Sequence, residues 1–94
     1  MSEQALQSKI LGYLKKHGYK SIKTIRVSVK GTSDILACSP SGLYVAIEVK
    51  APGKMNTVSP LQKHFIKEIN KRGGLAFATD NYKGFIKRIN NEKT

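Results

Sequence analysis

Two acidic residues stand out because acids are rare in this chain. Asp34 and Glu48 lie in largely apolar stretches, and Lys50 follows Glu48 two positions later. Carboxylates, completed by water and phosphate oxygens, are ligands that suit Mg²⁺. A cation held in this way polarises a phosphate and lowers the pKa of a water, and a neighbouring ammonium stabilises the negative charge that develops. The three residues therefore point to hydrolysis of a phosphodiester bond, provided that the fold brings them together.

The alternation of side chains along a strand places two of these residues on one face. In the segment 43–50 the odd positions are all apolar, as expected for residues that face a core. Glu48 and Lys50 are at even positions. They are therefore expected to share the opposite face.

A short turn decides whether Asp34 joins them. Pro40-Ser41-Gly42 suits a three-residue hairpin loop, with proline at the first turn position and glycine in the left-handed conformation. That loop pairs Ser39 with Leu43, and the antiparallel register then places Asp34 opposite Glu48. A four-residue loop would instead put the two acids on opposite faces of the sheet.

Two opposed carboxylates need a reason to lie side by side. Directly opposed Cβ atoms in an antiparallel pair are roughly 4.5–5.5 Å apart, and like charges there are destabilising. A divalent cation between Asp34 and Glu48 would remove that repulsion. The alternative is that Asp34 is a turn residue after Gly31, and that Glu48 and Lys50 form a solvated pair. Three such residues in a strongly basic chain favour the functional interpretation.

Glu3 and Gln62 are further candidates, each with an equally good structural role. Glu3 extends the apolar stripe of the first expected helix and could reach a metal site at the sheet edge, or it could simply favour the helix dipole. Gln62 could contact a metal-bound water or a phosphate from the start of the second helix. It could equally be the capping-box partner of Ser59.

The charge balance points to a polyanionic partner. The 94 residues include 17 Lys and Arg but only 6 Asp and Glu, a formal net charge of +11. Such a charge attracts nucleic acid, although an RNA-binding or membrane-surface protein could show the same balance. The candidate phosphate contacts are Lys54, Lys63, Lys67, Lys71 and Arg72.

The length and the apolar fraction of 39% fit one folded domain over residues 1–94. No apolar run is long enough to cross a bilayer, and the start lacks a signal-peptide pattern, so we expect the protein inside a cell. The single cysteine, Cys38, excludes an internal disulfide and is expected to be buried in a strand. His17 and His64 lack metal-ligand spacing and are expected to be surface or boundary residues.

Periodicity and capping signals predict the order αβββαβα, a mixed sheet flanked by helices. Ser2 is the expected N-cap of the first helix, and Asp80 or Asn81 that of the last. The expected elements are a helix over 3–16, strands over 21–29, 33–39 and 43–50, a helix from Ser59-Pro60 to Arg72, a strand over 75–79 and a final helix carrying Phe85, Ile86 and Ile89.

Three motifs in this order resemble the PD-(D/E)XK nuclease superfamily, and within it the VRR-NUC family of virus-type replication and repair nucleases. The motifs are Gly31-Thr32-Ser33-Asp34-Ile35, Ile47-Glu48-Val49-Lys50 and Ser59-Pro60-Leu61-Gln62. A lone Glu-x-Lys is common by chance, whereas the spaced set is far more specific. The family's Pro-Asp is Ser33-Asp34 here, at a position that commonly varies.

The resemblance implies a single-domain α/β restriction-endonuclease-like fold and a DNA endonuclease dependent on Mg²⁺ or Mn²⁺. It implies metal ligation by Asp34, Glu48 and the Val49 carbonyl, with Lys50, Gln62 and Glu3 as further catalytic residues. Short stand-alone members are similar to phage proteins, and some act as homodimers on branched DNA such as Holliday junctions. A role in DNA repair, in the cytoplasm of a bacterial or phage-infected cell, is the corresponding expectation.

Overall fold

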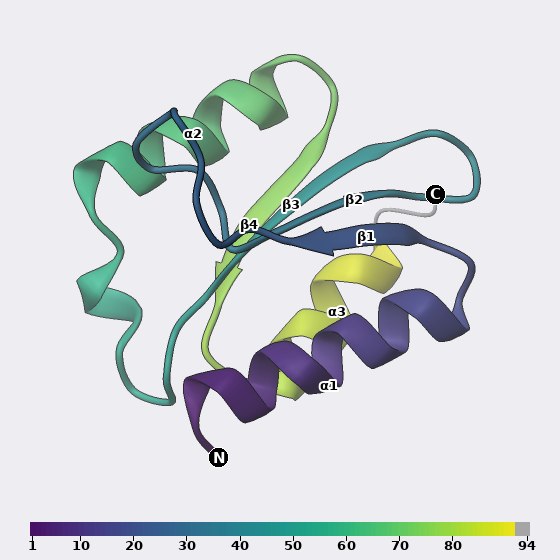
Figure 1. Ribbon diagram of the computed structural model, residues 1–94, viewed down its shortest axis with the longest axis horizontal. Helices are drawn as coiled ribbons and strands as arrows, with labels where there is room; N and C mark the ends of the chain where they lie inside the picture. Colours follow the sequence, from purple (N-terminus) through teal and green to yellow (C-terminus); the bar gives the residue numbers. More distant parts are fainter. Residues whose placement is uncertain (92–94) are drawn as a thin grey trace.

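The computed structural model describes residues 1–91, and the chain order is the expected αβββαβα. A one-turn 3₁₀ helix, η1, precedes the second α-helix (Figure 1). The elements are α1 (Glu3–Lys16), β1 (Lys20–Lys23), β2 (Ile35–Cys38), β3 (Tyr44–Val49), η1 (Met55–Thr57), α2 (Pro60–Lys71), β4 (Leu75–Thr79) and α3 (Tyr82–Asn91).

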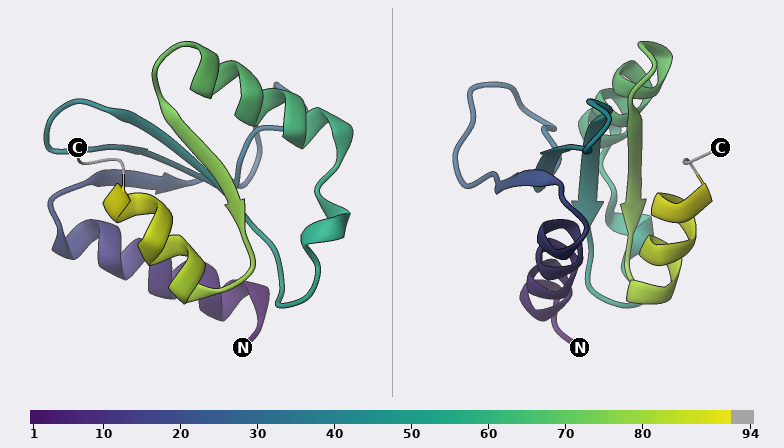
Figure 2. Two further views of the ribbon diagram at one scale, coloured as in Figure 1. Left: turned by 180° about the vertical axis from the view of Figure 1, so that it is seen from behind. Right: turned by 90° about the vertical axis from the view of Figure 1, so that its right-hand side faces the viewer.

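The four strands form one mixed sheet in the order β1-β2-β3-β4. The β1–β2 and β2–β3 pairs are antiparallel, and the β3–β4 pair is parallel, joined by a crossover through α2. Helices α1 and α3 lie together against one face of the sheet, whereas α2 lies on the other (Figures 1 and 2). The sheet is therefore the middle of three layers, and its β1 side is left uncovered by α2.

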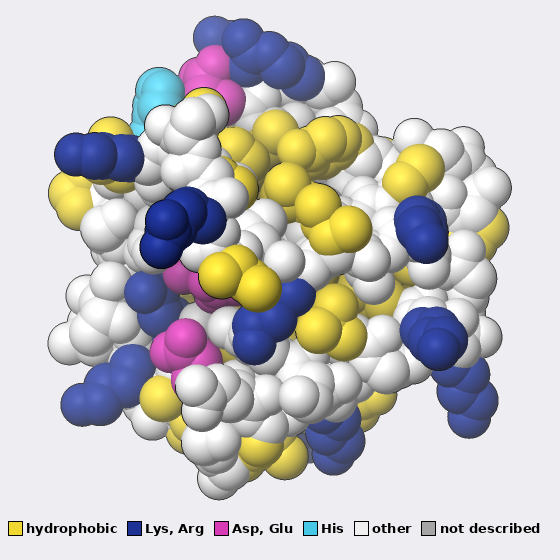
Figure 3. Space-filling view, viewed as in Figure 1, with side chains coloured by type: hydrophobic (Ala, Val, Ile, Leu, Met, Phe, Trp, Pro, Cys, Tyr) yellow, Lys and Arg dark blue, Asp and Glu magenta, His cyan; other side chains and the backbone are white. Residues whose placement is uncertain are grey.

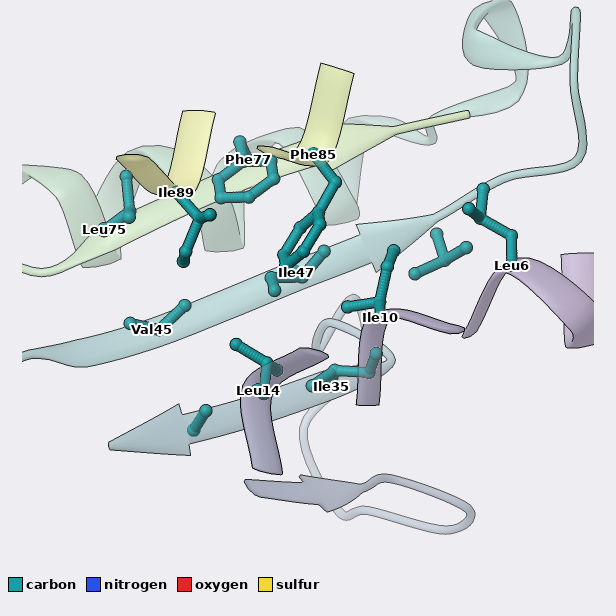
Figure 4. Close-up of a cluster of buried hydrophobic side chains, with 12 residues drawn as sticks. Leu6, Ile10, Leu14, Ile35, Val45, Ile47, Leu75, Phe77, Phe85 and Ile89 are labelled. Carbon is teal, nitrogen blue, oxygen red and sulfur yellow. The ribbon is translucent and has the colours of Figure 1, made fainter. Parts of the chain in front are cut away.

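The core fills the layer between the sheet and the pair α1 and α3. Odd-numbered residues of β3, such as Val45 and Ile47, face this layer and meet side chains from both helices, as Figure 4 shows. Ile10 and Phe85 are fully buried there. Because β3 alternates, its even-numbered residues, among them Glu48, must face α2. The buried side chains of this cluster are Leu6, Ile10, Leu14, Ile35, Ala37, Val45, Ile47, Val49, Leu75, Phe77, Phe85 and Ile89.

Each α-helix begins at a side-chain cap. The Ser2 hydroxyl accepts a hydrogen bond from the Ala5 N–H, which confirms the predicted start of α1. Of the two residues considered for α3, Asn81 fills the role, because its Oδ1 accepts from the Gly84 N–H. None of the helices among residues 1–91 is long and apolar enough to span a membrane.

The first strand is much shorter than predicted. The alternation over 21–29 favoured one long strand, but β1 ends at Lys23 and residues 24–29 are irregular. β1 is an edge strand, and β2, its one partner within residues 1–91, begins at Ile35, opposite Lys23. Beyond that pair there is no strand to bond, so the β propensity of the segment is not realised.

Cys38 is exposed, not buried as predicted. It lies at the end of β2 on the sheet face that α2 would have to cover, next to an open groove lined by Ile22, Leu36 and Tyr44. Because α2 covers only the β3–β4 side, alternation in the strand did not imply burial here. His17 and His64 are exposed, as predicted.

Candidate active site

The hairpin between β2 and β3 brings the two acids face to face. Its Pro40-Ser41-Gly42 loop is closed by hydrogen bonds from the Ser39 N–H to the Leu43 carbonyl and from the Gly42 N–H to the Ser39 carbonyl, both 2.9 Å. Gly42 has a φ of 91°, the left-handed conformation that such a loop requires. The predicted turn is therefore confirmed.

The register of this hairpin places Asp34 opposite Glu48. Ile35 pairs with Ile47, so the next pair outward is Asp34 with Glu48. Asp34 itself stands just before β2, and its Oδ2 accepts a hydrogen bond of 2.8 Å from the Val49 N–H. This bond fixes one oxygen of Asp34 at the end of β3. The carboxyl group of Asp34 lies close enough to Glu48 for its negative charge to raise the pKa of Glu48.

Among residues 1–91, Glu48 is the charged residue that the fold buries. It is only 2% exposed, and its pKa is raised from 4.5 to about 7. Burial is the main cause, and the negative charge of Asp34 adds to it, while the Lys50 ammonium acts in the opposite direction. An acid held beside another acid in a buried position costs stability. Such a pair indicates a site built for a ligand.

Gln62 serves both of the roles that its sequence position allowed. Its Oε1 accepts from the Ser59 N–H at 2.8 Å, and its own N–H donates to the Ser59 hydroxyl, which completes a capping box. Its Nε2 donates to Glu48 Oε2 at 3.0 Å. The cap therefore fixes the amide group, and the amide group in turn orients the buried carboxylate.

Lys50 contacts the same oxygen of Glu48 as Gln62 does. Its Nζ lies 3.5 Å from Glu48 Oε2, and its side chain is 15% exposed. The Lys50 N–H is bonded to the Thr79 carbonyl, so the backbone that carries the lysine is held against β4. The ammonium group is thus positioned beside the acids while keeping limited access to solvent.

The oxygens of these acids fit a divalent cation. Glu48 Oε1 is buried and, among residues 1–91, has no hydrogen-bond partner, while Oε2 is already engaged by Gln62 and Lys50. A free buried oxygen on Glu48, with Asp34 opposite it in the register, suits Mg²⁺, which commonly takes only one or two carboxylates from a protein. In the described part of the chain no third His, Cys, Asp or Glu joins such a cluster.

Glu3 is not brought to this cluster. It is exposed in the first turn of α1, and α1 packs on the sheet face opposite to α2 and Glu48 (Figure 2). Its catalytic role and the metal-binding role of the Val49 carbonyl stay predictions, whereas Asp34, Glu48, Lys50 and Gln62 converge.

The predicted phosphate contacts are all exposed, but they are not equivalent. Lys63, Lys67 and Lys71 recur every four residues along α2 and so share one side of it. The Arg72 guanidinium instead pairs with Glu68 Oε1 at 2.5 Å, and Lys54 lies just before η1. On the face drawn in Figure 3, basic side chains are widespread and acidic ones are few.

Gly31, which opens the first of the three motifs, also shapes the site through its backbone. Its φ is 86°, and a Cβ at this position would stand 2.5 Å from the Leu61 carbonyl oxygen. Only glycine allows the segment before Asp34 to pack so closely on the first turn of α2, next to Gln62. The sequence offered one signal for this role, which is the position of Gly31 three residues before Asp34.

A comparison with protein families matches residues 1–80 to the VRR-NUC domain. No curated protein and no solved structure matches the chain. The matched range contains every converging residue of the site and ends one residue beyond β4. The mixed four-stranded sheet with its helices in the order αβββαβα is the expected restriction-endonuclease-like fold.

Proposed function

This chain belongs to the VRR-NUC family, and from that premise we propose that it is a divalent-metal-dependent endonuclease that hydrolyses phosphodiester bonds in DNA. The family is one of PD-(D/E)XK-type nucleases, so a nuclease domain is present. The observation that carries the proposal is the buried carboxylate of Glu48, which lies beside Asp34 and has one oxygen without a partner among residues 1–91.

Each residue of the site has its own proposed role. Asp34 and Glu48 would hold Mg²⁺ or Mn²⁺, which, when bound, supplies polarisation of the phosphate and a more acidic water. Lys50 holds a positive charge beside the carboxylates, where it stabilises negative charge that develops on the phosphate. Gln62 keeps Glu48 in one orientation through its hydrogen bond to Oε2. Preorganised groups of this kind cost no rearrangement during the reaction.

The proposed substrate is branched DNA, including Holliday junctions, cut by a homodimer. A domain of this size offers little surface for reading an extended sequence, so recognition of DNA shape is the simpler task. Twofold symmetry would present two active sites to two strands of a junction. We place this activity in DNA repair, in the cytoplasm of a bacterial or phage-infected cell.

The proposal is tested by incubating the purified protein with labelled junction and linear DNA, with Mg²⁺ or with EDTA. Wild type should cut only with Mg²⁺, and Lys50→Ala should cut about 100-fold more slowly. Binding of both proteins to DNA in EDTA should remain similar. Lys16→Ala, which removes an exposed lysine from the last turn of α1, is the matched control and should cut normally.

Two results would contradict the proposal. Cleavage by Lys50→Ala at the wild-type rate would remove the lysine from the chemistry. Salt-sensitive DNA binding by wild type, without any metal-dependent cleavage, would instead identify a non-catalytic nucleic-acid-binding module. Mass measurement in solution tests the homodimer separately.

A further inference from the structure

Residues 24–33 form a loop that projects beside the active site. The loop leaves the end of β1, passes in front of α2 in Figure 1 and returns directly to Asp34. In the right-hand view of Figure 2 it stands clear of the sheet. The proposed function gives this loop no task.

The loop displays apolar side chains at its surface. Ile25 is 91% exposed, Val29 59% and Val27 49%. Arg26, Ser28 and Lys30 alternate with them and are also exposed, and no acid occurs in 24–33. Apolar side chains left in water gain nothing for the fold, since burial is what makes them stabilising. A cluster of them on one loop therefore indicates a binding surface.

Both ends of the loop are fixed to the site. At the start, the Thr24 N–H donates to the Asp34 carbonyl at 2.7 Å, and its hydroxyl donates to the Ser33 carbonyl at 2.8 Å. At the end, Gly31 packs on the backbone of Leu61. The two stems of the loop are thus tied to Asp34 and to the first turn of α2, so the apolar tip projects from the edge of the site.

We propose that the tip of this loop engages the branch point of a DNA substrate. Ile25 and Val27 pack against a base pair whose stacking neighbour is missing, and Arg26 and Lys30 contact the adjoining phosphates. The inference rests on the proposed function and names the surface that selects the substrate.

The charge of the loop favours DNA, and not a second copy of the chain, as the partner that its tip binds. The loop carries two cations and no anion, so it complements phosphates, whereas two such loops placed together would repel each other. Apolar side chains inserted between base steps are a known way to open DNA. Insertion costs less where a step is already interrupted, so such a tip would prefer branch points to intact duplex.

The test uses a binding signal that is independent of cleavage. The Glu48→Gln variant, in EDTA, is mixed with a four-way junction or a linear duplex that carries 2-aminopurine at the central base step. Fluorescence should change on the junction and stay constant on the linear duplex, because the tip covers the exposed face of the probe only at the branch point. The change should disappear when Ile25→Ser and Val27→Ser are added, and should persist with Tyr44→Ser. Tyr44 is a matched control because it is exposed at the far end of the hairpin.

The rates of cleavage of junction and duplex DNA provide a second measurement. In the otherwise wild-type protein, Ile25→Ser with Val27→Ser should lower the preference for junction over duplex by about tenfold, because an apolar wedge no longer favours the opened step. The rate on linear duplex should be retained. Circular dichroism checks folding, and Ile25→Ser alone is the milder variant, since that side chain is almost fully exposed.

Unchanged fluorescence and unchanged junction preference in both loop variants would overturn the proposal. So would a wild-type dimer that becomes a monomer on loop substitution, because the tip would then be an interface between copies. If wild type cuts neither DNA, the proposed function fails, while the fluorescence result still decides whether the loop engages DNA.

Discussion

At the scale of single residues, the site depends on two acids, Asp34 and Glu48, which the fold holds together although their proximity is unfavourable. Glu48 is buried beside Asp34, and its raised pKa records the cost of that placement. The identity of the pair could be predicted from sequence, because alternation and the hairpin turn together fix the register. The second function of Gln62 could not be chosen from sequence, since capping and contact with Glu48 use different atoms of one amide group.

The cost of burying Glu48 should appear as pH-dependent stability of the metal-free protein. The folded state keeps its proton up to about pH 7, whereas the unfolded chain releases it near 4.5. Rising pH between these values therefore favours unfolding. Relative to Glu48→Gln, wild type should lose at most about 3 kcal/mol across this window and little beyond it. Denaturant unfolding in EDTA at several pH values measures the difference.

Glu68→Gln is the matched control for that experiment. The pKa of Glu68 is lowered by its hydrogen bond to Arg72, so its contribution should change with pH in the opposite direction. If wild type and Glu48→Gln differ in unfolding free energy by the same amount at pH 4.5 and pH 8, ionisation of Glu48 does not destabilise the folded protein.

At the scale of elements, the order of helices and strands was predictable, and the length of β1 was not. Capping signals at Ser2 and Ser59 are local, so they are readable from sequence. A strand also needs a partner, and the partner of β1 begins only at Ile35. The alternating segment after Lys23 therefore became a projecting loop, and no local pattern distinguishes the two outcomes.

The contact between this loop and α2 gives a prediction for Gly31→Ala. The new Cβ would collide with the backbone of Leu61 and would also be held at a left-handed φ. We expect a loss of about 1–3 kcal/mol in stability. We also expect slower cleavage by the protein that remains folded, because displacement of Leu61 moves Gln62. Chemical denaturation and cleavage assays on the same preparation measure both effects.

Gly73→Ala separates strain from collision. Gly73 has a φ of 92°, but a Cβ there would meet nothing within 4 Å. The Gly73→Ala variant should lose stability through backbone strain alone, and it should keep the wild-type cleavage rate. Equal cleavage by Gly31→Ala and Gly73→Ala would contradict a positioning role for Gly31.

At the scale of the whole molecule, charge predicts how DNA binding responds to salt. The net charge of +11 was evident from composition, whereas the pairing of Arg72 with Glu68 required the structure. If Lys63, Lys67 and Lys71 each contact a phosphate, replacing any one by alanine should lower the slope of log K against log salt by about one. Fluorescence anisotropy over a salt series measures the slope.

Lys16→Ala is the control for this series. It removes the same charge from α1, on the other side of the sheet from α2. Its slope should equal that of wild type. A slope that falls equally for Lys16→Ala and Lys67→Ala would mean that DNA senses overall charge and does not follow α2.

The most direct test of the account is calorimetric titration of Mn²⁺ into the metal-free protein at pH 8, where Glu48 is ionised. Wild type should bind the cation, and Asp34→Asn and Glu48→Gln should each weaken binding by about tenfold or more, since each removes an anionic oxygen ligand. Glu68→Gln, which removes an acid on α2 that is paired with Arg72, should bind as wild type does. Equal Mn²⁺ affinity in wild type, Asp34→Asn and Glu48→Gln would contradict a cation site between the two carboxylates.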